Sequence, residues 1–300
     1  MRFTIFQDSR PGDRKGNEDR VGYSYSKNAL LLVIADGMGG HMKGEVAAEI
    51  AVTEMTRLFQ QEARNRLRKP FDFLVTAMNS AHRAIVAYAV EHNLLESPRT
   101  TCVACVIQGS VAYWAHAGDS RLYAFRDGNL AAVTQDHSRV QQLIDAGTIT
   151  PEAAARHPDR NKIFSCLGGV VPPQITTGRE FPLQPGDTLA LCTDGFWAQI
   201  AASTIGTLLR KQDITGLFPG LITEAHRRAG GTSDNISVVA MTWVSQDDLA
   251  DTQVLGDEEF TTSTNTTQPL DVPVPADDVT EEDIERAIAE IQSAIRKVPR

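Results

Sequence analysis

A buried strand that ends in a carboxylate constrains this chain more than any other feature. The run from Ala29 to Ala35 is apolar throughout and leads directly into Asp36-Gly37-Met38-Gly39-Gly40, and a helix-like stretch begins at Gly44. Glycines let such a turn leave carboxylate and carbonyl oxygens open to a cation. On this pentapeptide alone, a cation site and an ordinary Asp-Gly turn between a strand and a helix are equally good interpretations.

The chain delivers further acids in a similar manner, each in a loop at the end of a predicted strand: Glu18, Asp19, Asp119, Asp194 and Asp234. Carboxylate and carbonyl oxygens without clustered His or Cys suit Mg²⁺ or Mn²⁺ rather than zinc or copper. Two such ions held by carboxylates would lower the pKa of a bridging water and aim it at phosphorus, while an Arg clamps the phosphoryl oxygens. The residues therefore predict a metal hydrolase, although they do not identify its substrate.

Composition predicts one large soluble domain followed by a tail. The 300 residues are 42% hydrophobic and 22% charged, which is typical of a globular protein. The net charge of -9 belongs to the tail, because 14 acids and 4 bases follow Val244. The main domain has no basic stripe with interleaved aromatics, which excludes a nucleic-acid surface. No apolar run reaches the roughly 18 residues of a membrane helix, so we expect no membrane association and a cytoplasmic location.

Periodicity predicts the elements of the main domain, residues 1–244. Apolar residues recur with a 3.6-residue period over 44–64 and 71–94, which predicts two long helices. Period-two alternation predicts strands. These predicted strands are 3–7, 21–25, 101–107, 111–117, 121–125, 130–133, 188–193 and 236–244. Strands 101–107 and 111–117 are predicted to form one hairpin, and strands 121–125 and 130–133 a second.

Three other features have structural interpretations. The basic run Arg64 to Lys69 is interpreted as a solvated helix end. Cys102 and Cys105 resemble half a zinc site, but no second pair follows, so packing in the core is favoured. Residues 137–170 form a long excursion between strands, which is often a lid or a binding loop.

The tail is predicted to have two parts. Residues 245–278 are rich in Thr, Asp, Pro and Gln and read as an acidic disordered linker. Residues 279–300 predict an amphipathic helix whose apolar stripe consists of Ile284, Ile288, Ile291 and Ile295. Such a stripe must be buried against its own domain, a second copy or the groove of a partner, so docking on a partner and self-association both remain open.

Five motifs, taken in order, resemble the metal-dependent serine/threonine phosphatases of the protein phosphatase 2C type. They are Arg14-x-x-x-Glu18-Asp19, Asp36-Gly-x-Gly-Gly40, Gly118-Asp-Ser-Arg121, Asp194-Gly and Gly231-x-x-Asp234-Asn-Ile236. The resemblance covers about residues 3 to 244. The stretches 136–138 and 157–161 look like the bacterial branch of that family.

The resemblance implies an α+β fold, a four-layer α-β-β-α sandwich with two antiparallel sheets packed face to face and flanked by helices. It implies two Mn²⁺ or Mg²⁺ ions, with Asp36 bridging both and the Gly37 carbonyl binding one. Asp194 and Asp234 would complete the other ion's ligands, Glu18 and Asp19 would contact or orient its waters, and Arg14 would hold the phosphate. A bridging hydroxide would attack phosphoserine or phosphothreonine in line, without a phosphoenzyme.

The resemblance also implies partners. These are phosphorylated proteins, with a serine/threonine kinase or its substrates in a bacterial signalling pathway. A catalytically degenerate regulator that only binds phosphoproteins is the alternative. That alternative predicts the loss of a core acid, whereas Asp36, Asp194 and Asp234 are all present.

Two positions depart from the family pattern. Met38 stands where eukaryotic relatives have a His that is a candidate general acid, so the general acid here is not identified. Ala198 stands where bacterial relatives often have an acid that helps the equivalent of Asp119 to hold a third ion. We therefore expect any third ion near Asp119 to bind weakly.

Overall fold

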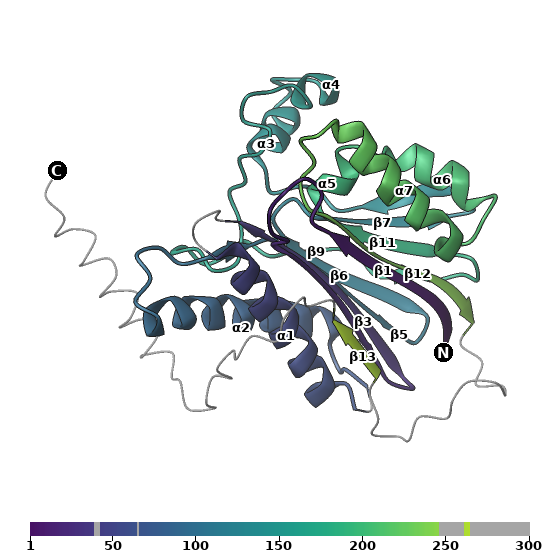
Figure 1. Cartoon of the computed structure of the whole chain (residues 1–300). Coiled ribbons are helices and arrows are strands. Elements are labelled where there is room, and N and C mark those ends of the chain that lie inside the picture. The colour runs from purple at the N-terminus through teal and green to yellow at the C-terminus, as the bar shows by residue number, and fades with distance from the viewer. Residues whose placement is uncertain (39–42, 65, 246–260, 265–300) are drawn as a thin grey trace, which may run out of the picture.

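Two antiparallel sheets packed face to face form the centre of the molecule (Figure 1). The computed structural model describes residues 1–38, 43–64, 66–245 and 261–264. The five-stranded sheet has the order β1 (Arg2–Arg10), β12 (Ile236–Ser245), β11 (Thr188–Cys192), β7 (Arg121–Arg126) and β8 (Asn129–Val133).

The second sheet has eight strands. Its order is β10 (Phe181–Pro182), β6 (Val111–Ala117), β5 (Cys102–Gln108), β3 (Ala29–Met38), β2 (Asp19–Tyr25) and β13 (Thr261–Thr264). The short strands β4 (Arg99–Thr100) and β9 (Thr176–Thr177) pair with β3 and β6 respectively.

Helices cover the outer face of each sheet (Figure 1). The eight-stranded sheet packs under α1 (Gly44–Glu62) and α2 (Pro70–Glu91), and the five-stranded sheet packs under α5 (Asp194–Trp197), α6 (Ala202–Leu209) and α7 (Ile214–Ala229). The predicted excursion contains α3 (Arg139–Asp145) and α4 (Pro151–Ala154), which lie beyond one end of the sandwich (Figure 1). The expected four-layer α+β sandwich is confirmed.

Strand β3 is apolar from Ala29 to Ala35 because both of its faces are buried there. Leu30, Leu32 and Ile34 pack in the core between the two sheets, whereas Leu31 and Val33 pack in the core beneath α1 and α2. Successive side chains of a strand point to opposite faces, so a strand between two layers needs apolar residues at every position. This burial fixes the register of β3 and hence the position of Asp36 at its end.

The structure confirms the expectation for the two cysteines but not the one for the basic run. Cys102 and Cys105 are buried in the core, as expected, and burial raises the pKa of the Cys102 thiol to about 12. The basic run is not a helix end, since α1 ends at Glu62 and α2 begins at Pro70. Arg64 and residues 66–69 instead lie in the connection between the two helices.

The tail differs from the expectation of a disordered linker at one place. Thr261–Thr264 form β13, an edge strand whose Thr261 is opposite Tyr25 of β2. A hydrogen bond joins the hydroxyls of Ser24 and Thr262 at 2.8 Å. The other residues after Ser245, including the predicted helix 279–300, lie outside the described residues. No helix in the described ranges has both the length and the apolarity needed to cross a membrane.

Candidate active site

Strands β2 and β3 bring two of the predicted acids side by side. Asp19 is the first residue of β2 and is directly opposite Asp36 of β3. Both acids were expected in loops, but both are in strands. Strand β3 continues past Asp36 to Met38 because Gly37 pairs with Thr100 of β4. Asp19 is in β2 because it pairs with Asp36. The Asp36 carbonyl accepts hydrogen bonds from the Thr101 amide at 2.8 Å and from the Thr100 hydroxyl at 2.9 Å. This end of β3 is therefore held firmly in place.

The five-stranded sheet supplies acids to the same end of the sandwich. Asp194 begins α5 two residues after β11, and Asp234 lies two residues before β12. Thr193 connects the two sheets at this point, since its hydroxyl donates a 2.8 Å hydrogen bond to the Asp19 carboxylate. Asp119 lies in the turn between β6 of one sheet and β7 of the other. Acids from both sheets thus lie near one another.

Electrostatic repulsion and burial affect these acids together. Burial, followed by repulsion from Asp19 and Asp194, raises the pKa of Asp36 well above its usual value. Burial is also the largest cause for Asp19 and Asp119, raising the pKa of each to about 7, and for Asp194, raising its pKa to about 6. Carboxylates with raised pKa values in one region are typical of a functional site rather than of a solvated surface.

This set of side chains fits divalent cations by its chemistry. The donors are hard carboxylate oxygens, the ligands that Mg²⁺ and Mn²⁺ prefer. Their shared repulsion would be relieved by positive charge placed between them. The described part of the chain contains no three His, Cys, Asp or Glu side chains that already close around one point.

Gly37 occupies a position that admits no side chain. A Cβ there would lie 2.3 Å from the Gly44 carbonyl oxygen and 2.7 Å from that of Glu18. The Gly37 amide also donates a 3.2 Å hydrogen bond to the Glu18 carbonyl. Glycine therefore allows β3, the start of α1 and the loop before β2 to meet beside Asp36. Gly39 and Gly40 of the same motif lie outside the described residues.

Asn235 organises the loop that contains Arg14 and Glu18. Its amide nitrogen donates to the carbonyls of Pro11 and Gly16, both at 2.9 Å, and its Oδ1 accepts from the Glu18 amide at 2.8 Å. Asn235 is buried. Three hydrogen bonds from one side chain fix the loop relative to β12, so Asn235 positions residues that the sequence alone marked as functional.

Arg14 lies beside one of these acids, Asp234. Its Nη2 donates to Asp234 Oδ2 at 2.9 Å, and 61% of its side chain is exposed. This ion pair, the largest cause, raises the pKa of the Arg14 guanidinium further. Arg14 is thus within reach of an acid proposed as a metal ligand and is also open to solvent.

Three hydrogen bonds, two with His137 and one with Trp197, fix the turn that contains Asp119. The His137 amide donates to the Gly118 carbonyl at 2.9 Å, and the Gly118 amide donates to His137 Nδ1 at 3.2 Å. Trp197 Nε1 donates to the Asp119 carbonyl at 2.9 Å, which links this turn to α5. Arg121 lies 3.6 Å from the centre of the Trp197 ring.

Comparison with known proteins agrees with this geometry. The model of the family described as Protein phosphatase 2C matches residues 8–232. The chain belongs to the protein phosphatase 2C family. It is 38% identical over 259 residues to the serine/threonine protein phosphatase PstP of Mycobacterium tuberculosis, covering 84% of this chain and 48% of PstP. The chain therefore spans about half the length of this relative.

Solved structures of family members share the fold. The serine/threonine phosphatase of S. agalactiae superimposes with a TM-score of 0.73 at 30% identity, covering 81% of this chain and all of that one. The catalytic domain of PstP in complex with two manganese ions superimposes with a TM-score of 0.69 at 35% identity, covering 81% and 99%. Manganese binding is thus described for a family member whose fold this chain shares.

The effect of Mn²⁺ on the stability of this protein is expected to depend on pH. Acids with raised pKa values bind protons in the folded state that they release when unfolded, so the metal-free protein should lose stability as pH rises from about 5 to about 7. Binding of Mn²⁺ requires the deprotonated acids, so stabilisation by Mn²⁺ should increase over the same range. Melting temperatures with Mn²⁺ and with chelator at pH 5.5, 6.5 and 7.5 test this. A constant difference would contradict the raised pKa values.

Proposed function

We propose that this chain hydrolyses phosphoserine and phosphothreonine in proteins, with Mn²⁺ or Mg²⁺ as cofactor and without a phosphoenzyme. The observation that carries this proposal is the meeting of Asp36, Asp19, Asp119 and Asp194 at one end of the sandwich, with raised pKa values and with Arg14 beside them. The family relatives named as serine/threonine phosphatases support it. The core acids are all present, which favours hydrolysis over phosphoprotein binding alone.

Asp36 and the Gly37 carbonyl would hold two cations together with Asp194 and Asp234, while Glu18 and Asp19 would contact or orient water around them. When bound, the cations supply Lewis-acid activation of water and neutralise negative charge on the phosphoryl group. The chain's own part is to fix the donors. Thr193 orients the Asp19 carboxylate through its 2.8 Å hydrogen bond, and Asn235 fixes the backbone of Glu18.

Arg14 is proposed to bind the substrate phosphate. A guanidinium has five N–H donors in a planar fork that matches two oxygens of a phosphate. In the structure, Arg14 makes a single 2.9 Å bond to Asp234, and its exposure lets it reach a phosphate that enters from solvent. Exchange of Asp234 for phosphate as its partner would also release that carboxylate to bind a cation.

The proposed substrates are phosphorylated proteins, including a serine/threonine kinase or its substrates in bacterial signalling. We propose that this activity is cytoplasmic. Hydrolysis would return the protein's serine or threonine hydroxyl and release inorganic phosphate directly.

Activity is expected to depend completely on a divalent cation. Chelation should abolish phosphate release from a phosphothreonine peptide, and excess Mn²⁺ should restore it, because cations supply both the nucleophile and charge neutralisation. Release of inorganic phosphate measures the rate, and gel autoradiography with ³²P-labelled peptide tests for a phosphoenzyme. A rate unchanged by chelator would disprove the metal mechanism. Peptide binding without phosphate release would instead identify a phosphoprotein-binding regulator.

A third ion near Asp119 is expected to bind weakly. Ala198 directly follows α5, one helical turn after Asp194, and its side chain has no carboxylate. Ala198→Asp should tighten the weakest Mn²⁺ binding step by about 10-fold or more, the effect of one added charged ligand. Isothermal titration with Mn²⁺ measures this, and Ala198→Asn is the neutral control. Equal affinities in the wild type and Ala198→Asp would show that the missing acid is not what limits binding.

A further inference from the structure

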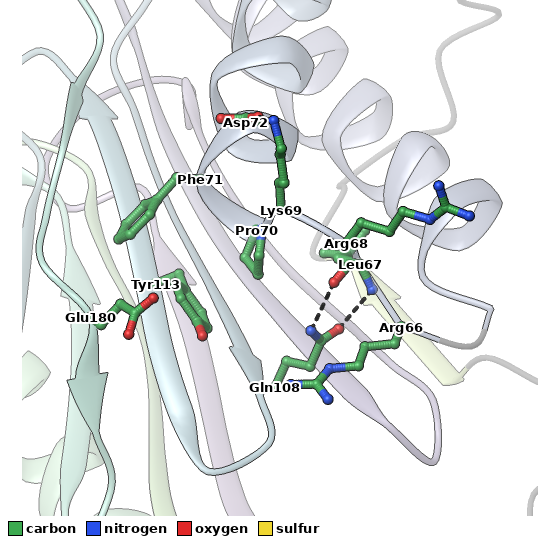
Figure 2. Close-up of a pocket in the computed structure, with 10 residues that line it drawn as sticks. All are labelled: Arg66, Leu67, Arg68, Lys69, Pro70, Phe71, Asp72, Gln108, Tyr113 and Glu180. Carbon is green, nitrogen blue, oxygen red and sulfur yellow. Dashed lines mark hydrogen bonds and ion pairs between the residues drawn. The ribbon is translucent and has the colours of Figure 1, made fainter.

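The basic connection between α1 and α2 lines a pocket (Figure 2). The pocket lies at the end of the sandwich opposite the acids. Gln108 of this pocket pairs with Ala29, the first residue of β3, whereas Asp36 lies seven residues further along that strand. At about 3.3 Å per residue, the two sites are roughly 23 Å apart along the strand. The pocket has a volume of about 550 Å³ and is separate from the candidate active site.

The wall of this pocket is held in place by its own contacts. Gln108 Oε1 accepts from the Leu67 amide at 2.8 Å, and its Nε2 donates to the Leu67 carbonyl at 3.0 Å (Figure 2). Both residues are buried. Phe71 and Tyr113 meet edge to face, with ring centres 5.2 Å apart, and form an aromatic side of the pocket. The backbone that presents the basic side chains is therefore fixed.

Three cations line the pocket and only one has a carboxylate partner in the described part of the chain. Lys69 pairs with Asp72 at 3.1 Å, whereas Arg66 and Arg68 make no ion pair with a described carboxylate. Burial and the nearby Glu180 raise the pKa of the Tyr113 hydroxyl, and Arg66 partly counteracts this. Asp72 and Glu180 also line the pocket, so three cationic side chains stand against two carboxylates and the net charge is positive.

The position of these cations is unfavourable in the absence of an anion. Lys69 is the N-cap of α2, and its side chain makes no capping hydrogen bond. The N-terminus of a helix already carries partial positive charge, so Arg68 and Lys69 add charge where it destabilises. Asp72 in the first turn offsets only part of this. An anionic group in the pocket would offset the remainder.

The chain itself contains a segment of matching charge. Residues 246–260 include six acids and no Lys or Arg: Asp247, Asp248, Asp251, Asp257, Glu258 and Glu259. The segment is attached at both ends to described strands, because β12 ends at Ser245 and β13 begins at Thr261. Fifteen residues span at most roughly 50 Å.

The attachment points lie at the pocket's end of the molecule. Thr261 is opposite Tyr25, next to the turn between β2 and β3, and that turn leads to Ala29 beside Gln108. Gln60 of α1 donates a 2.7 Å hydrogen bond to Thr262. Two residues later α1 ends and the basic connection begins. Thr261, the residue at which the acidic segment ends, therefore lies near the basic connection.

We propose that this pocket binds a carboxylate-rich peptide and that its occupant is the acidic segment 246–260 of the same chain. Tethering at both ends gives the segment an effective concentration in the millimolar range, which makes weak contacts sufficient. The contact would strengthen the attachment of β13, whose four residues are held by β2 and by polar side chains. This inference does not depend on the proposed function.

Hydrogen exchange of the Thr261–Thr264 amides in the full chain tests the proposal. Arg66→Glu with Arg68→Glu should accelerate exchange of these amides by about 3- to 10-fold at low salt, the modest effect expected of exposed ion pairs. The difference should vanish near 1 M NaCl, where charges are screened. Arg160→Glu with Lys211→Glu changes two exposed cations elsewhere and should leave the exchange unchanged.

A reciprocal variant makes the test specific. A triple variant carries Asp257→Lys, Glu258→Lys and Glu259→Lys. By itself, this variant should accelerate exchange of the Thr261–Thr264 amides. Combined with the two pocket substitutions, it should restore wild-type exchange. Unchanged exchange, or a combination that fails to restore it, would overturn the proposal. If the pocket substitutions instead slow hydrolysis of an acidic phosphoprotein and leave β13 exchange unchanged, the occupant is a substrate and not this segment.

Discussion

Asp36→Asn is expected to reduce kcat/KM for a phosphothreonine peptide by at least about 100-fold, because loss of even an outer partner of a metal ligand costs about 10- to 100-fold. The same substitution should not weaken the metal-free fold. Burial and repulsion from Asp19 and Asp194 raise the pKa of Asp36, so an uncharged isostere relieves repulsion among neighbouring acids. We therefore expect the metal-free melting temperature to stay the same or rise.

The two effects together distinguish a metal ligand from a structural residue. Stabilisation by Mn²⁺ should be largely lost in Asp36→Asn, whereas a variant that merely misfolds would melt earlier with and without metal. Asp136→Asn is a useful comparison, because Asp136 is also buried but binds Arg121 through two 2.8 Å bonds. It should lower the melting temperature with and without Mn²⁺. Wild-type activity in Asp36→Asn would exclude Asp36 as the bridging ligand.

Local patterns in the sequence were sufficient to predict the strands that deliver Asp36 and Asp194. A strand buried on both faces must be apolar at every position, and an Asp-Gly pair marks its end. The positions of these acids at one end of the sandwich followed from the family resemblance, since strand order is not a local property. The structure confirms the sandwich and brings the acids together.

Residues whose role depends on distant partners were not found from the sequence. Thr193, which follows β11, meets the Asp19 carboxylate although 174 positions separate the two residues in the chain. Asn235 acts on a loop that begins more than 200 residues earlier. Its place directly after Asp234 in a glycine-rich motif was the one available signal, but an Asn in such a turn has many possible uses.

Contacts between residues far apart in the sequence also determine where β3 ends and whether β13 forms. Strand β3 extends past Asp36 because β4 pairs with Gly37, and a two-residue strand has no periodicity to recognise. Strand β13 was missed for a similar reason. Thr261–Thr264 have high β-propensity, but they lie in a region too polar to predict burial, and only the free edge of β2 makes them a strand.

Gly37→Ala is expected to cause the second large loss of activity, about 100-fold or more, through backbone geometry alone. The added Cβ would lie 2.3 Å and 2.7 Å from two backbone carbonyl oxygens, those of Gly44 and Glu18. These atoms belong to the start of α1 and to the loop before β2, so neither yields by a simple side-chain rotation. The resulting shift would displace the Gly37 carbonyl and Asp36, and small displacements at a reacting centre are sufficient for losses of this size.

Gly16→Ala is the matched control. Gly16 lies in the loop that contains Arg14 and Glu18, but a Cβ there meets no atom within 4 Å, and its φ is not in the left-handed region. It should keep nearly full activity and gain up to about 1 kcal/mol of stability by restricting the unfolded chain. Gly37→Ala should instead lose about 1–3 kcal/mol, as overpacking does. Steady-state kinetics, Mn²⁺ titration and urea unfolding of both variants measure these effects. Activity of Gly37→Ala within about threefold of wild type would show that the junction of β3 and α1 tolerates displacement, and that the Gly37 carbonyl is not a required ligand.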